Sequence, residues 1–211
     1  MGTNLPVKVK VLSCFGSHPI CKTFLPNFIK IGAQNCSAED KGPFTGEISA
    51  SMLREKSVSY VLIGHSERRT LFKETDDVIF KKVKAAIRSK LTPIVCIGET
   101  LSDKKANNTL QVLDSQINGS LAKIEPNEQV IVAYEPVWAI GTGLTPDENE
   151  IKESHLYIKT KLNQHFNTDI PILYGGSANS ENCSQIISIE NVGGLLVGCL
   201  LYTSPSPRDR G

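Results

Sequence analysis

The chain has 211 residues, 40% of them hydrophobic and 21% charged, which is the composition of an ordinary globular domain. Its formal net charge of +1 gives no basis for a nucleic-acid or anionic-membrane partner, and no apolar run approaches the roughly 18 residues of a membrane-spanning helix. The six cysteines form no C-x-x-C pair and no metal-ligand pattern with histidine, so a reducing, cytoplasmic environment fits best.

Seven short apolar runs of strand length occur along the chain, separated by segments of helical periodicity. They span residues 7–14, 29–33, 58–63, 93–97, 130–134, 170–174 and 194–197. From the third run onward their ends fall roughly 30 to 40 residues apart, the length of a βα unit. Such alternation predicts parallel pairing with right-handed crossovers. Seven units with no linker between them favour one α/β domain built as a closed (β/α) barrel over an open, doubly wound sheet.

Two of the intervening segments show clear helical patterns. In the first, apolar residues recur at helical spacing, and Lys81, Lys82 and Lys84 are expected on the solvated face. The second opens with acids at 147, 148 and 150, which suit a helix N-terminus. The two apolar stripes are Ile79, Val83, Ala86 and Ile87, then Ile151, His155, Ile158 and Leu162. On such a stripe His155 is expected to be a packing residue rather than a ligand.

The stretch around which the chain is organised covers residues 130–143 and reads VIVAYEPVWAIGTG. Its first five residues are apolar and mostly β-branched, as in a strand buried on both faces. Glu135 stands where this strand must end, because Pro136 prevents further pairing. The apolar loop that follows is closed by Gly141 and Gly143. This pattern predicts a lid that closes over a ligand and expels water, with Glu135 as a catalytic candidate; the alternative is a buried connection that never moves.

A candidate partner for this carboxylate follows the apolar run that ends at residue 64. His65 comes next, ahead of Ser66 and Glu67, which are expected to open a short helix. The positive end of that helix keeps the imidazole neutral, so that it can donate a hydrogen bond to a developing oxyanion. A hydrogen-bonded structural histidine is the alternative interpretation.

Two glycine-containing turns favour a phosphate site. Gly175 and Gly176 follow one strand, and Ala178 and Asn179 are expected to begin a helix whose backbone N–H groups bind an anion. Gly198 follows the next strand in the same way, and phosphate sites after strands seven and eight recur in barrels. A carboxylate base, a neutral imidazole, a lid and a phosphate cradle together predict proton abstraction next to a carbonyl in a small phosphorylated substrate.

Five stretches carry a family resemblance: residues 31–49 (IGAQNCSAEDKGPFTGEIS), 60–69 (YVLIGHSERR), 96–100 (CIGET), 133–143 (AYEPVWAIGTG) and 174–177 (YGGS). Together they resemble the triosephosphate isomerase family over about residues 5 to 198. The resemblance implies a TIM barrel that interconverts dihydroxyacetone phosphate and glyceraldehyde 3-phosphate through an enediolate, with no cofactor and no metal. Glu135 then matches the family's general base, His65 its neutral electrophile, and Glu67 a glutamate that supports the active site.

The resemblance also implies how the substrate phosphate is bound. The lid residue Gly141, with Ser177 and Gly198, matches backbone donors to the phosphate. Cys199 stands where the family has a second glycine, which is a departure from the pattern. Pro146, near the end of the lid, lacks an N–H and cannot donate a hydrogen bond in a closed state.

A dimer is implied as well. The loop that carries Phe44, Thr45, Gly46 and Glu47 resembles the family's dimer loop, which reaches into the active site of the other subunit. Glu47 would pair with Arg68 of the partner subunit. The expected partners are therefore a phosphorylated triose and a second copy of the chain, in the cytoplasm.

The chain departs from the family at both ends. It starts at what resembles the second strand, so about seven of eight barrel strands are expected, and the asparagine and lysine that end the family's first strand are absent. We expect a truncated barrel over residues 1–198 and a tail over 199–211 that resembles translated adapter sequence, because its prolines exclude a covering helix; a natural disordered tail is the alternative. With bare sheet edges, this chain is expected to be inactive and aggregation-prone. Two readings besides an active isomerase stay open: a catalytically inactive fragment that retains the dimer surface, and another phosphate-binding barrel isomerase.

Overall fold

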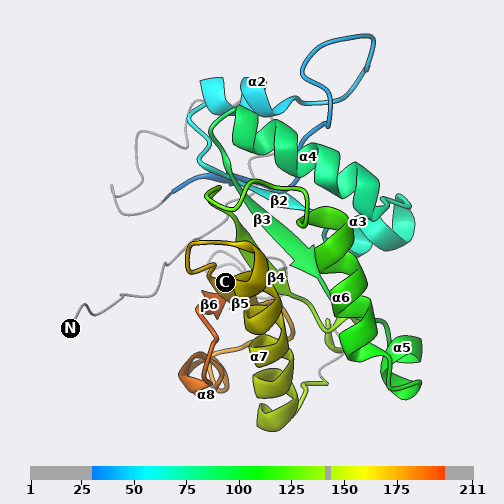
Figure 1. Cartoon of the computed structure of the whole chain (residues 1–211), viewed down its shortest axis with the longest axis vertical. Helices are drawn as coiled ribbons and strands as arrows, with labels where there is room; N and C mark the ends of the chain where they lie inside the picture. The colour runs from blue at the N-terminus through cyan, green and yellow to red at the C-terminus, as the bar shows by residue number, and fades with distance from the viewer. Residues whose placement is uncertain (1–29, 141–143, 198–211) are drawn as a thin grey trace, which may run out of the picture.

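The computed structural model describes residues 30–140 and 144–197. In these ranges one parallel sheet is formed by β1 (Gly32–Ala33), β2 (Tyr60–Ile63), β3 (Thr92–Ile97), β4 (Ile131–Tyr134), β5 (Ile172–Tyr174) and β6 (Gly194–Leu195). The strands are ordered in the sheet as they are in the chain. The sheet therefore curls in one direction, as a half-barrel (Figure 1), whereas a doubly wound sheet reverses at a switch point. The predicted barrel is confirmed for these strands; the run at 7–14 and the tail at 199–211 lie outside the described residues.

Each face of the sheet has its own core, because successive strand residues point to opposite sides. Alternate residues such as Val61, Val95 and Val132 pack with apolar side chains of the helices. The residues between them form a second buried cluster on the inner side of the curl: Leu62, Ile94, Cys96, Ile131, Ala133 and Leu173. Burial on both faces explains why the strands read as continuous apolar runs.

Helices connect the strands. They are α2 (Ala50–Glu55), α3 (Ser66–Leu71), α4 (Asp76–Arg88), α5 (Leu101–Lys105), α6 (Thr109–Ser120), α7 (Glu148–His165) and α8 (Cys183–Ser188), with a 3-10 turn, η1 (Val137–Ala139). The three longest, α4, α6 and α7, lie side by side against the sheet (Figure 1). Among the described residues, no helix combines the length and the apolar character needed to cross a membrane.

The predicted apolar stripes are confirmed, with one correction on α4. The stripe residues of α7 are all buried, and those of α4 are buried except Ile87, which is partly buried. Lys82, predicted on the solvated face, is instead only 5% exposed. It lies three residues after Ile79 and four before Ala86, which is the spacing of the buried face. Its charge is compensated there, because Nζ donates to Glu74 Oε1 at 2.6 Å and to Asn35 Oδ1 at 2.7 Å.

The turn after β5 also differs from its prediction. The helix expected to begin at Ala178 and Asn179 begins at Cys183. The Asn179 Oδ1 atom accepts hydrogen bonds from the N–H groups of Glu181 (2.9 Å) and Asn182 (3.0 Å). The Asn179 side chain thus binds N–H groups that would otherwise be unpaired at the start of a helix. Residues 178 and 179 therefore lie in a loop and not at a helix N-terminus.

The buried side chain of His155 makes the stability of the folded chain depend on pH. It is fully buried, its Nδ1–H donates to the Asn191 carbonyl at 3.2 Å, and its Nε2 has no partner. Burial lowers the pKa of His155 from 6.5 to about 4. The unfolded chain therefore binds a proton that the folded chain excludes between these two pH values, so stability is lost as the pH falls below 6.5.

When the pH falls from 7 to 5, we expect the free energy of unfolding to decrease by on the order of 2 kcal/mol because of His155. The reason is that its pKa is near 4 in the folded chain, well below its value in the unfolded chain. Denaturant unfolding of the wild type and of His155→Gln at both pH values measures the difference. The variant should lack this component, since glutamine does not titrate. An equal pH dependence in the two proteins would contradict the assignment.

Candidate active site

Glu135 is the first residue after β4 and is 2% exposed. Its backbone N–H donates to the Ile97 carbonyl at 2.8 Å, which continues the pairing of β4 with β3 by one residue. Two glycines make room for it. A Cβ at Gly98 would lie 1.7 Å from the Glu135 carbonyl oxygen, and one at Gly175 would lie 2.9 Å from its Cγ. The backbone of the neighbouring strands thus fixes this carboxylate at the carboxyl edge of the sheet, where barrel enzymes carry their reactive groups.

The structure brings His65 to this carboxylate from the end of β2. The His65 Nε2 atom lies 3.3 Å from Glu135 Oε1, and the Ser66 N–H donates to Glu135 Oε2 at 3.0 Å. His65 is the N-cap of α3, and its Nδ1 accepts the Glu67 N–H at 3.3 Å. A ring nitrogen that accepts carries no proton, so the imidazole is neutral and its Nε2–H points to the carboxylate.

Burial raises the pKa of Glu135 above its ordinary value. His65, the Ser66 N–H, the Cys96 thiol and the Arg69 guanidinium oppose the rise by favouring the ionised form. A carboxylate with a raised pKa is a stronger base when ionised. The site therefore holds a dry, hydrogen-bonded carboxylate beside a neutral imidazole that retains an N–H donor.

The first half of the predicted lid forms η1 and is tied to the same edge of the sheet. The Trp138 Nε1–H donates to Glu99 Oε1 at 2.7 Å, and the Val137 N–H donates to the Glu99 carbonyl at 3.0 Å. On the other side the Ser177 hydroxyl donates to the Ala139 carbonyl. Burial raises the pKa of Glu99, which is 1% exposed. The apolar loop is thus held by polar contacts on both sides.

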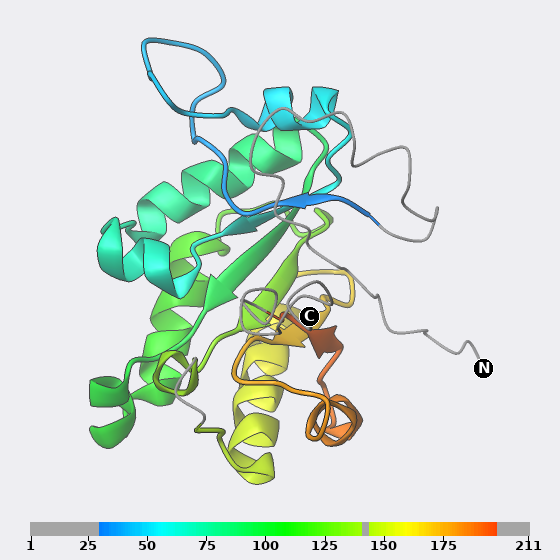
Figure 2. The same ribbon diagram turned by 180° about the vertical axis from the view of Figure 1, so that it is seen from behind.

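The remaining predicted residues have different positions. The Glu67 side chain is 72% exposed and its Oε2 lies 3.9 Å from His65 Nδ1, while the Glu67 backbone N–H donates to the same nitrogen at 3.3 Å. Arg68 donates to Glu74 Oε1 at 2.5 Å. Phe44, Thr45 and Glu47 are exposed on the loop between β1 and α2, which projects beyond the sheet and helices (Figures 1 and 2). The structure does not bring these three to Glu135. Three predicted phosphate ligands, Gly141, Gly198 and Cys199, lie outside the described residues.

Four contributors to the site were not singled out from the sequence: the Ser66 N–H, Cys96, Gly98 and Arg69. The sequence could have indicated the Ser66 N–H, because the residues that begin a helix have unpaired N–H groups. Cys96 reads as an ordinary buried thiol, and Gly98 and Arg69 act through chain segments that are distant in sequence.

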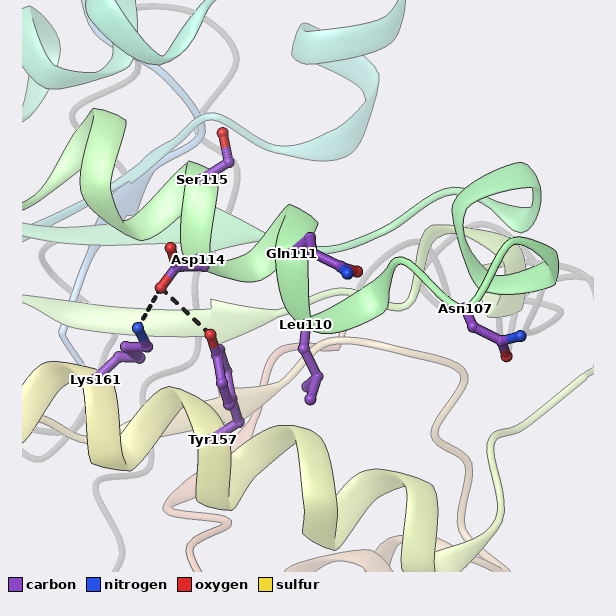
Figure 3. A pocket seen from close by; sticks show the side chains of 7 residues that line it. All are labelled: Asn107, Leu110, Gln111, Asp114, Ser115, Tyr157 and Lys161. Atoms are coloured by element: carbon purple, nitrogen blue, oxygen red, sulfur yellow. Dashed lines mark hydrogen bonds and ion pairs between the residues drawn. The ribbon is translucent and has the colours of Figure 1, made fainter.

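A groove of about 470 Å³ lies between α6 and α7, away from Glu135 and His65. Three of its polar side chains contact one another. The Asp114 Oδ1 atom lies 2.5 Å from Lys161 Nζ and accepts the Tyr157 hydroxyl at 3.3 Å (Figure 3). None of the predicted site residues lines the groove. We therefore locate the candidate site at the carboxyl edge of the sheet.

The fold and this edge define a parallel α/β barrel protein with a paired carboxylate and imidazole. Residues 3–204 match the family model described as triosephosphate isomerase. A triosephosphate isomerase from Thermodesulfovibrio yellowstonii is 47% identical over 180 residues, which cover 84% of this chain and 73% of the relative. One from Bartonella henselae is 45% identical over 173 residues, covering 81% and 68%. The crystal structure of triosephosphate isomerase from Bartonella henselae matches with a TM-score of 0.74 and 42% identity, covering 80% of this chain and 69% of that one. The chain belongs to the triosephosphate isomerase family.

Proposed function

We propose that the product of the complete gene interconverts dihydroxyacetone phosphate and glyceraldehyde 3-phosphate by proton transfer through an enediolate. The observation that carries the proposal is the pairing of Glu135 with a neutral His65, 3.3 Å apart at the carboxyl edge of the sheet. This division of roles between a glutamate base and a neutral histidine is the established one for the family. Other reactions that start by proton removal next to a carbonyl would use the same two groups, and the family membership favours the triose phosphates.

In the proposed reaction Glu135 removes a proton from the carbon next to the carbonyl. His65 Nε2–H donates a hydrogen bond to the carbonyl oxygen as negative charge develops there. The hydroxyl proton of the first carbon must also pass to the former carbonyl oxygen, and His65 can relay it by giving its Nε2 proton to that oxygen and taking the hydroxyl proton in exchange. The same carboxylate then returns its proton to the former carbonyl carbon, so no proton is gained or lost overall. For this the carboxylate must exchange its present contacts with Ser66 and His65 for contacts with the substrate.

Water must be excluded while the enediolate exists, since this intermediate readily eliminates phosphate in solvent. The apolar lid that contains Trp138 supplies the cover. We propose that Gly141, Ser177 and Gly198 bind the substrate phosphate, with Cys199 beside them. Glu67 supports the site through the N–H that fixes the tautomer of His65.

We further propose a cytoplasmic homodimer built on the loop with Phe44, Thr45 and Glu47, with Arg68 of the partner subunit as the contact of Glu47. Large apolar side chains are exposed on this loop and on α2, which follows it: Phe44, Ile48 and Met52. Exposed apolar surface of this kind supports a protein interface. Sedimentation analysis should give twice the mass of one chain, and a monomer at micromolar concentration would contradict this part.

Turnover by the product of the complete gene tests the function. Dihydroxyacetone phosphate and a phosphoribosyl ketose–aldose pair are offered separately, without added metal or cofactor. The proposal expects conversion of the triose phosphate and none of the phosphoribosyl compound. The opposite preference would assign another phosphate-binding barrel isomerase, and inactivity toward both would contradict the proposal and favour a non-catalytic protein.

A further inference from the structure

The guanidinium of Arg69 connects the ends of β2 and β3, close to the pair formed by Glu135 and His65. Arg69 lies in α3, and its side chain is 17% exposed. Its Nε donates to the Gly64 carbonyl at 2.9 Å and its Nη2 to the Cys96 carbonyl at 3.1 Å. Its Nη1 donates to Asp76 Oδ1 at 2.6 Å. The planar fork of arginine suits such a three-way contact, which the single ammonium group of lysine cannot reproduce.

The first contact fixes the turn that leads into His65. Gly64 has φ +72°, in the left-handed region, and a Cβ there would lie 2.8 Å from Ile79 Cδ1. The turn is therefore glycine-dependent, and the hydrogen bond to its carbonyl holds the peptide directly before the imidazole. A shift of this peptide would change the direction of Nε2.

The second contact lies behind Glu135. Cys96 is fully buried, and its thiol favours the ionised form of the Glu135 carboxylate. Arg69 binds the carbonyl of the same cysteine. The third contact stabilises the guanidinium itself, because α6 packs tightly on Asp76: a Cβ at Gly119 would lie 2.6 Å from Asp76 Cβ. Arg69 is thus supported from outside and in turn supports both halves of the site.

Arg69 also acts on Glu135 through its charge. The groups that favour ionised Glu135 are His65, the Ser66 N–H, the Cys96 thiol and Arg69. The imidazole is neutral because its Nδ1 accepts a hydrogen bond. Arg69 is therefore the member of this set with a permanent positive charge.

We propose that Arg69 is a positioning residue for the reaction, which holds the turn before His65 and the Cys96 backbone in place, and that its fixed positive charge, bound to the Cys96 carbonyl, favours ionised Glu135. The proposal rests on the proposed function, because it assigns Arg69 a part in that proton transfer. Two effects follow, one on geometry and one on charge, and substitution can separate them.

The test compares Arg69→Lys and Arg69→Met in the product of the complete gene. Loss of the fork should lower kcat in both variants by about tenfold to a hundredfold, since small misplacements of reacting groups are costly. Loss of the charge should move the acidic limb of the kcat/KM profile to higher pH in Arg69→Met but not in Arg69→Lys. Arg88→Met is the matched control, because Arg88 makes a similar two-point contact with Asp40 at an exposed place; it should retain the wild-type kcat and pH profile.

A purely structural role predicts a different pattern. If the folded fraction of Arg69→Met keeps the wild-type kcat and acidic limb while only its melting temperature falls, the proposal is wrong. If Arg69→Met does not fold, Asp76→Ala takes its place, because it leaves the guanidinium but removes its outer acceptor. A wild-type kcat in Asp76→Ala would then overturn the proposal, and a kcat lowered severalfold would support it.

A carboxyl titration separates this proposal from the proposed function. The ionisation of ¹³C-labelled Glu135 is followed by NMR in wild type and in Arg69→Lys and Arg69→Met, with no substrate present. A titration midpoint that rises only in Arg69→Met supports the charge effect even if triose phosphates are not turned over. An unchanged midpoint in an active enzyme overturns that effect and leaves the function intact.

Discussion

Replacing Glu135 by glutamine should lower kcat for triose phosphate isomerisation by at least about 10²–10⁴-fold, the usual contribution of a general base. Glutamine keeps the size of the side chain and can accept the Ser66 N–H, but it cannot take a proton from carbon. Steady-state assays in both directions with the product of the complete gene measure the loss. Glu153→Gln, an exposed change of the same type on α7, should leave kcat unchanged.

The same variant should not be less stable than the wild type. Glu135 carries a charge at 2% exposure, and burial disfavours that charge. Removing it should leave the melting temperature unchanged or raise it. Low activity combined with a lower melting temperature would point to misfolding instead, and near-normal turnover would remove Glu135 from the mechanism.

Gly98→Ala should destabilise the fold by about 3 kcal/mol or more, at the upper end of what overpacking costs. The new Cβ would lie 1.7 Å from the carbonyl oxygen of Glu135, which is backbone and cannot rotate away. Gln116 also fixes this glycine, since its side-chain amide bonds both the N–H and the carbonyl of Gly98 at 2.8 and 3.1 Å. The strand ends must therefore separate, and any folded protein should have low activity because Glu135 moves with its backbone.

Gly193→Ala is the control for this change. Its Cβ would have its nearest neighbour at 3.3 Å, which is tight but tolerable after a small shift. Chemical denaturation of the two variants and the wild type gives the comparison. A loss in Gly98→Ala no larger than that in Gly193→Ala would show that the strand ends can yield, and would contradict the rigid placement of Glu135.

The sequence predicted the position of a site residue best where a single reactive side chain directly follows a strand. Glu135 before Pro136, and His65 at the end of an apolar run, could be placed at the same edge from the strand pattern alone. Lys82 could not, because a buried lysine depends on Glu74 and Asn35, which come from other elements. The start of α8 was placed too early because the Asn179 side chain forms a local turn. Gly98 and Arg69 contribute through close approach and long-range hydrogen bonds, which have no local pattern in the sequence.

The most direct test of the account is isomerisation in deuterated water. Dihydroxyacetone phosphate is converted in D₂O by the wild type and by Glu135→Gln, and the position of hydrogen in the product is read by NMR. A carboxylate that carries the proton between neighbouring carbons can exchange it with solvent, so deuterium should enter the product made by the wild type, and the variant should form almost none. Product formed by the wild type with no deuterium at all would indicate direct hydride transfer and would contradict a role for Glu135 as the base.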